Sequence, residues 1–154
     1  MARMKRVILL MACFVALGAF VQAQDVTPAM EADFLIKVKA AVGQKDFAAF
    51  SALHCQKGTV DPAMKDQLDK FSRGLFDTIA GMSSPDYEFV QPPAKMLTSF
   101  SHEGKNYEPN LKIVGLLQVH DPNGKPNTAA GGTWSFPLGV DNGALMIVQT
   151  VLKK

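Results

Sequence analysis

The residues of this chain that could carry chemistry are few, and the adjacent pair His54 and Cys55 comes first among them. A cysteine nucleophile needs a base within hydrogen-bond reach, and a third group must orient that base. Neighbours in sequence near a helix end point in different directions, so adjacency does not supply this geometry. We predict that Cys55 is buried and unreactive, and no catalytic residue is assigned.

Metal and phosphate sites have no signature in the sequence. The three histidines, His54, His102 and His120, stand singly, with no H-x-x-x-H or C-x-x-C spacing among them. Metal ligands usually recur at such spacings. The glycine-rich stretch 124–132 lacks the Walker spacing and its Ser or Thr. The sequence therefore indicates no metal ligand and no cofactor-binding residue.

Gln118 and His120 form the remaining candidate. They alternate along one face of a predicted strand, beside Val114 and Leu116. A few polar groups among apolar walls are typical of a ligand site, so both residues are possible ligand contacts. The same alternation is also typical of the solvent face of an antiparallel sheet. The sequence is compatible with both interpretations.

The first 23 residues carry a targeting pattern. Arg3, Lys5 and Arg6 precede an apolar run over 7–21, and small residues end it at Ala23. This order predicts a secretory signal peptide, cleaved between Ala23 and Gln24, and an exported protein, either periplasmic or extracellular. A retained anchor, or lipidation of Cys13, is the alternative. Residues 24–154 then form a single domain.

The charge of the predicted mature chain argues against nucleic acid as a partner. Three of the sixteen basic residues and none of the fourteen acidic ones lie in the signal, which leaves thirteen against fourteen, a formal charge of −1. Basic and acidic residues are interspersed, so no cluster is available to neutralise phosphates. No later segment approaches the length of a membrane span.

Helices are predicted first along the mature chain. Thr27-Pro28, Asp46 and Asp61-Pro62 are helix starts, with a capping side chain before the first turn. Gly43 is expected to stop the first helix. The third helix has an apolar stripe expected to face the core: Met64, Leu68, Phe71, Leu75, Phe76 and Ile79. Its outer face offers two acid-before-base pairs four residues apart, Asp66 with Lys70 and Asp69 with Arg73.

Strands are predicted after Asp86. Period-two alternation and turn residues give the strands 87–90, 95–102, 111–120, 134–138 and 144–152, with turns at 103–106 and at Asp141-Asn142-Gly143. The last strand is apolar on both faces, as in a strand covered on both sides. The fold class is therefore α+β, with N-terminal helices packed on one face of a curved antiparallel β-sheet formed by the C-terminal half.

The segment 40–53, Ala-Ala-Val-Gly-Gln-Lys-Asp-Phe-Ala-Ala-Phe-Ser-Ala-Leu, resembles the opening of the nuclear transport factor 2-like superfamily. The resemblance implies a cone-shaped α+β fold, in which a curved sheet wraps around helices and often encloses a pocket. The Asp and Tyr residues that serve the enzymes of the superfamily have no matched motif here, so none is carried over.

Three functions remain as hypotheses. The first is a non-enzymatic, exported domain that binds a small apolar ligand or another envelope protein, because no catalytic signature is present. The second is a pocket enzyme of the ketosteroid-isomerase or polyketide-cyclase type. The third is a structural protein that assembles through its sheet, as a homo-oligomer or with a partner.

Overall fold

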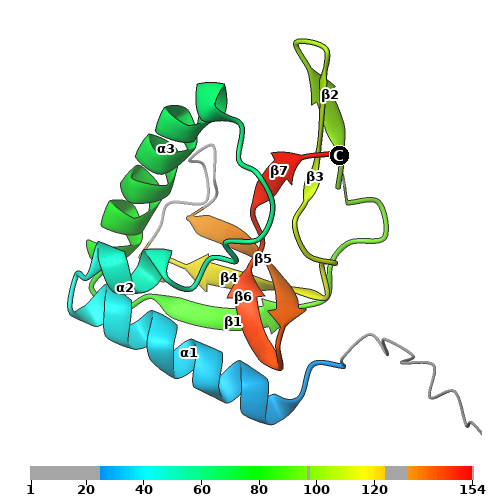
Figure 1. Cartoon of the computed structure of the whole chain (residues 1–154). Helices are drawn as coiled ribbons and strands as arrows, with labels where there is room; N and C mark the ends of the chain where they lie inside the picture. Colours follow the sequence, from blue (N-terminus) through cyan, green and yellow to red (C-terminus); the bar gives the residue numbers. More distant parts are fainter. Residues whose placement is uncertain (1–24, 97, 124–131, 154) are drawn as a thin grey trace, which may run out of the picture.

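The structure is a computed structural model that describes residues 25–96, 98–123 and 132–153. Over these residues, helices from the N-terminal half precede antiparallel strands from the C-terminal half, so the fold is α+β as predicted (Figure 1). The predicted signal peptide, its cleavage site at Ala23 and Gln24, and Cys13 lie outside the described residues. So does most of the glycine-rich stretch, 124–131.

The first two helices are capped where the sequence predicts. In α1 (Pro28–Gly43) the hydroxyl of Thr27 accepts a hydrogen bond from the N–H of Met30, at 3.3 Å. In α2 (Phe47–Ser51) the carboxylate of Asp46 accepts one from Ala49, at 3.0 Å. Gly43 ends α1, but the left-handed turn residue is Lys45, with φ of 54°. The connection between the helices is short, and it brings Phe50 of α2 into the same core as Phe34 of α1.

The third helix, α3 (Pro62–Ala80), is only partly packed. Asp61 caps it by accepting from the N–H of Ala63, at 3.0 Å. Phe76 and Ile79 are buried, whereas Phe71 is 70 % exposed. The prediction that the whole stripe faces the core is therefore wrong. Phe71 lies about 140° around the helix from Phe76 at 3.6 residues per turn, so both cannot face one core.

The strands form two antiparallel sheets rather than the single sheet predicted. The first has the order β1-β4-β5-β6, with bounds Asp86–Val90, Gly115–His120, Thr133–Asp141 and Ala144–Ile147. The second has the order β2-β3-β7, with bounds Phe100–His102, Lys105–Pro109 and Thr150–Leu152. β2 and the start of β3 project away from the helices (Figure 1).

Both predicted turns exist, and each is only two residues long. Asn142 and Gly143 have φ of 49° and 80°, and Asp141 pairs with Ala144 across them. This is the turn chemistry that an Asn-Gly hairpin requires. The predicted turn at 103–106 is shorter than expected. Glu103 and Gly104 make it, with φ of 48° and 74°, and β3 begins at Lys105.

The predicted last strand, 144–152, is divided between the two sheets. Leu145 and Ile147 of β6 join the core under the helices. After β6 ends at Ile147, the next buried residues are Val148 and Val151. Val151 belongs to β7 in the second sheet. Both faces of the segment are apolar because it crosses from one sheet to the other, not because one strand is covered twice.

Asn110 fixes this crossing. Its side-chain amide donates to the carbonyls of Cys55 and Lys57, at 2.7 and 3.0 Å. Its side-chain oxygen accepts from the N–H of Gln149, at 2.9 Å, and its own N–H donates to the carbonyl of Gln149. One side chain thus joins the segment after α2, the end of β3 and the connection from β6 to β7.

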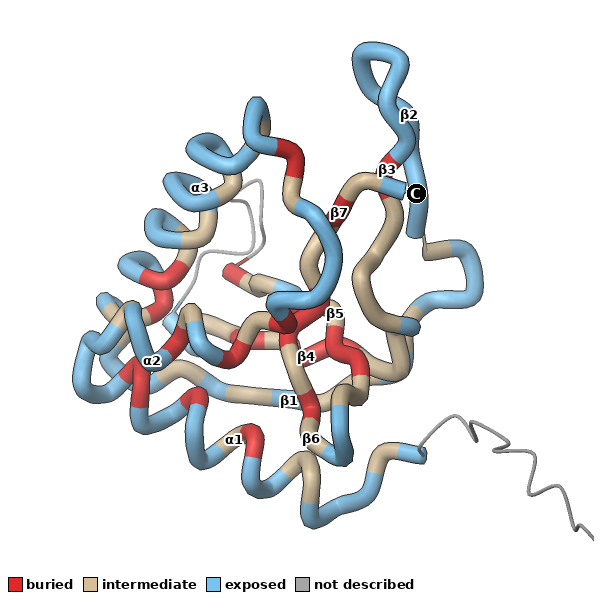
Figure 2. The backbone as a smooth tube through the Cα atoms, in the orientation of Figure 1, coloured by how far each residue is buried: buried red, intermediate tan, exposed pale blue. Residues whose placement is uncertain are grey.

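The core lies between the helices and one face of the first sheet. Phe50 is its centre, with ring centroids 5.1 Å from Phe76 and 5.7 Å from Phe136. Leu117 and Val119 of β4 are fully buried beneath the helices. In Figure 2 the buried residues gather there, while β2 and most of α3 are exposed. None of the helices in the described part of the chain is long and apolar enough to cross a membrane.

Candidate functional site

A groove runs between α3 and the strands opposite it, with a volume of about 630 Å³. One wall is the apolar side of α3, with Leu68, Phe71 and Leu75. The other wall comes from β5, β6 and the start of β7, and α2 with the residues after it forms the end. The apolar residues of these other surfaces are Phe47, Val60, Phe136, Pro137, Ile147 and Val148.

The groove exists because α3 is held at its two ends. Phe76 and Ile79 insert into the core at the C-terminal end. At the N-terminal end the buried carboxylate of Asp61 accepts hydrogen bonds from the Tyr107 hydroxyl, at 2.6 Å, and from the Lys105 ammonium, at 2.8 Å. Both partners belong to β3. Between these anchors, Leu68 and Leu75 remain only half-buried.

The hydrogen bonds at Asp61 shift the pKa values of the residues that hold the N-terminal end of α3. The hydrogen bond from Lys105, followed by that from Tyr107, lowers the pKa of Asp61 from 3.8 to about 2. The bond to Asp61 in turn raises the pKa of Tyr107 to about 12, with burial as a second cause. Asp61 is therefore charged and Tyr107 neutral through the physiological range. In these protonation states the Asp61 carboxylate accepts hydrogen bonds, and the Lys105 ammonium and the Tyr107 hydroxyl donate them.

His54 lies at the end of the groove formed by α2. The backbone of the next residue fixes its position, because the N–H of Cys55 donates to the carbonyl of Ile147, at 2.9 Å. Burial lowers the pKa of His54 from 6.5, and the nearby carbonyls of Phe50 and Ser51 oppose this only in part. Its Nδ1 is buried without a hydrogen-bond partner among the described residues. His54 is thus a neutral imidazole at the end of the groove.

Charged residues of α3 line the rim of the groove: Lys65, Asp69, Lys70 and Arg73. The structure pairs them differently from the prediction. Asp69 binds Lys65, one turn earlier, at 2.5 Å, and the predicted pairs with Asp66 and Asp69 as acids do not form within the described residues. The Arg73 guanidinium instead lies over the Phe47 ring, 4.2 Å from its centroid.

Gln118 and His120, the predicted ligand contacts, are outside this groove. Both are half-buried on β4, on the face opposite Leu117 and Val119. His120 Nδ1 is 2.9 Å from the Thr133 hydroxyl, and its Nε2 is 3.5 Å from a carboxylate oxygen of Glu88. The two residues therefore sit among polar groups of neighbouring strands rather than between apolar walls.

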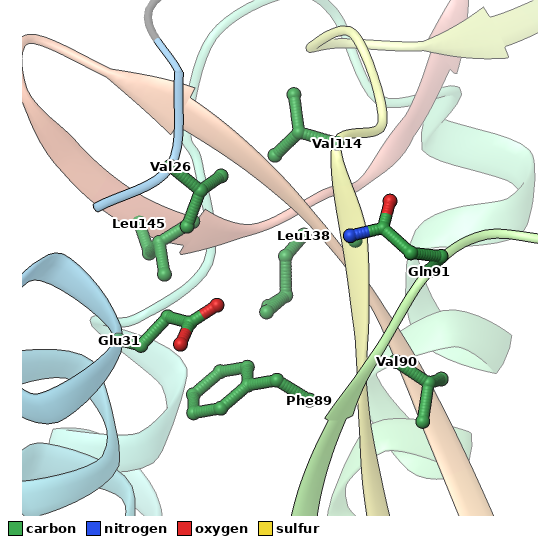
Figure 3. A pocket seen from close by; sticks show the side chains of 9 residues that line it. Val26, Glu31, Phe89, Val90, Gln91, Val114, Leu138 and Leu145 are labelled. Atoms are coloured by element: carbon green, nitrogen blue, oxygen red, sulfur yellow. The ribbon is translucent and has the colours of Figure 1, made fainter. Parts of the chain in front are cut away.

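A second, much smaller cavity lies between α1 and the first sheet, with a volume of about 50 Å³. Figure 3 shows the carboxylate of Glu31, from α1, directed toward the space bordered by Val26, Phe89 and Leu138. Ligand pockets for small organic molecules occupy about 300–1,000 Å³. This cavity has room for water only.

The sequence does not reveal the groove, but it correctly predicts the burial of Cys55. Cys55 is 1 % exposed, which confirms its predicted burial. The sequence presents His54 as a possible partner of Cys55 or as one of three scattered histidines, whereas the structure places it in the groove. The width of the apolar stripe of α3 is the sequence signal for the groove. A stripe too wide to be buried in one core leaves some of its apolar residues on another surface. Across the described ranges, no three His, Cys, Asp or Glu side chains come together as metal ligands.

No protein-family model, curated protein or solved structure matches this chain. The fold and the groove define it as an α+β domain with a cleft of the size that small-molecule sites have.

Proposed function

We propose that this protein is an exported, non-enzymatic domain that binds a small apolar ligand in the groove between α3 and the strands. The observation that carries the proposal is the groove itself, with apolar residues on both walls and a volume of about 630 Å³. The resemblance of residues 40–53 to the nuclear transport factor 2-like superfamily agrees with it, since the cone of that superfamily often encloses a pocket.

The exposed side chain of Phe71 supplies a driving force for binding. At 70 % exposed, it keeps most of its ring in water on the groove side of α3. Fully burying a Phe side chain is worth about 1.5–3 kcal/mol. A ligand that covers Phe71 and the half-buried Leu68 and Leu75 gains part of that free energy.

Binding is favoured over catalysis because the polar groups of the groove are not arranged as an acid and a base. Among the described residues that line the groove, His54 is the one titratable group that is half-buried rather than exposed, and no carboxylate binds it. Asp69 is at the exposed rim, where it pairs with Lys65. A pocket enzyme of the isomerase or cyclase type needs a base within hydrogen-bond reach of its substrate and a group to stabilise the charge that develops.

The test is binding of an apolar fluorescent probe, together with native mass spectrometry of residues 24–154. Phe71→Ser should weaken the probe at least about 5-fold, since it removes an apolar wall of the site. Ile36→Ser on α1 is the matched control, because Ile36 is 67 % exposed and does not line the groove. Equal probe affinity in the two variants would contradict the proposal.

Native mass spectrometry separates the alternatives. A small adduct that is lost in Phe71→Ser supports a ligand in the groove. A dimer without adduct, dissociated by the same substitution, would assign the groove to a second copy of the chain instead. Turnover of a ketosteroid or polyketide substrate that His54→Ala abolishes would replace binding with catalysis.

A further inference from the structure

We propose that the ligand is an amphiphile with a single carboxylate, held by Arg73 where the rim of the groove meets α2, with its apolar chain between α3 and the strands. This rests on the proposed binding function and adds the chemical class of the ligand. It is carried by the position of Arg73 and by the charge around it.

Arg73 is positioned by an aromatic platform. Its guanidinium lies 4.2 Å from the centroid of the Phe47 ring. Phe47 packs edge-on against Phe76, at 5.5 Å, and Phe76 is 1 % exposed in the core. The platform is therefore fixed by the core. A guanidinium stacked in this way loses less conformational entropy when it binds a ligand than a free side chain does.

Among the described residues, Arg73 has no acidic partner. Asp69, the acid one turn before it, is bound to Lys65. Within the described residues, no carboxylate lies within ion-pair distance of Arg73 or of Lys70. The segments 1–24 and 124–131 contain no Asp or Glu that could pair with either residue.

The charge of the rim is opposite to that of the chain. Three basic residues, Lys65, Lys70 and Arg73, line the groove with one acid, Asp69. Residues 24–154 together carry a formal charge of −1. A local excess of positive charge beside an apolar cleft favours an anion with an apolar tail.

A carboxylate fits this arrangement better than a bare apolar molecule. The guanidinium presents parallel N–H donors that match the two carboxylate oxygens. The apolar chain then extends from Phe47 past Leu75 on one wall and Phe136 on the other. His54, which is neutral because burial lowers its pKa, adds no charge farther along.

The experiment compares decanoate, decanol and decylamine, which share one chain and differ in the head group, by isothermal titration calorimetry. The mature wild-type protein should bind decanoate at least about 10-fold more tightly than decanol, because hydrogen bonds between two charged groups are stronger than those to a neutral hydroxyl. Decylamine should bind most weakly. Added salt should weaken decanoate and leave decanol unchanged.

Arg73→Gln should reduce the preference for decanoate to less than about 3-fold and leave decanol binding as in wild type. Lys37→Gln is the control, since Lys37 lies on α1 away from the groove, and it should keep the full preference. If Arg73→Gln does not fold, the salt dependence in the wild-type protein decides the same question.

The outcomes distinguish the two proposals. Equal, salt-independent binding of decanoate and decanol would overturn the carboxylate while leaving the apolar groove intact. A preference retained in Arg73→Gln would overturn the role of Arg73. No binding of any of the three, together with no effect of Phe71→Ser on the fluorescent probe, would overturn the binding function itself.

Discussion

The two halves of α3 have the same kind of sequence but different surroundings. In the C-terminal half, Phe76 and Ile79 are 1 % exposed and belong to the core. In the N-terminal half, Phe71 is 70 % exposed, and the end of the helix is held by the polar contacts of Asp61. One half is anchored by apolar packing and the other by hydrogen bonds. A single amphipathic helix can thus serve a core at one end and the wall of a groove at the other.

The largest difference is expected between two Phe→Ala substitutions in this helix. Phe76→Ala should lower the free energy of unfolding by about 3–5 kcal/mol, because it leaves a cavity in the core. Phe71→Ala should change it by no more than about 0.5 kcal/mol, since little area is buried there. Urea melts of both variants measure this, and equal losses would remove the distinction between the halves.

Cys55 reports whether the core opens together with the groove. It is 1 % exposed, follows His54 in the sequence, and belongs to the buried core. A thiol reagent should label the folded protein at least about 10³-fold more slowly than the urea-unfolded chain, because access requires global unfolding. Prompt labelling of the folded form would mean that motion of α3 exposes the core as well. The matching substitution, Cys55→Ala, should reduce stability rather than ligand binding.

The polar anchor of α3 should fail at low pH. The pKa of Asp61 is about 2 in the folded protein against 3.8 ordinarily. As the pH falls, the unfolded chain takes up this proton first, so protonation favours unfolding. The contribution of Asp61 is therefore complete above about pH 4 and is lost as the pH falls toward about 2.

Urea midpoints measured across this range should fall with pH in the wild-type protein and less steeply in Asp61→Asn. Amide exchange near Lys65 should accelerate before exchange near Phe76. Simultaneous exchange of both halves would indicate that Asp61 does not anchor one half separately.

The smallest effect is expected for the ion pairs on helix surfaces. Lys65 with Asp69 and Lys37 with Asp33 are both exposed pairs four residues apart. Asp69→Asn and Asp33→Asn should each cost no more than about 0.5 kcal/mol in thermal or urea melts. Asp69→Asn should, in addition, change ligand binding, because Asp69 lines the groove and Asp33 does not.

The helices and their place before the strands could be predicted because their signals are local. A capping Thr or Asp before a Pro or an apolar turn determines where a helix begins, and Asp46, Asp61 and Thr27 all act this way. The Asn142-Gly143 hairpin follows from the positive φ that its turn demands. Such features depend on a few neighbouring residues, so the sequence alone identifies them.

The groove and the second sheet could not be predicted because they depend on distant residues. The pairing of Tyr107 with Leu152, and of Asp61 with Tyr107, joins segments with no common local signal. Periodicity gave the apolar positions of α3 but not which of them reach the core. Gln118 and His120 are candidates because they alternate on one strand, and alternation does not tell which face a cavity occupies.

The passage of residues 144–152 through both sheets has a consequence for how the molecule comes apart. β6 is hydrogen-bonded to β5 in one sheet and β7 to β3 in the other, with Asn110 bonded to Gln149 between them. Strain applied to either sheet is therefore transmitted along a few covalent bonds to the other. The two sheets should behave mechanically as one unit, so that pulling on the projecting β2–β3 arm loads the core strands directly.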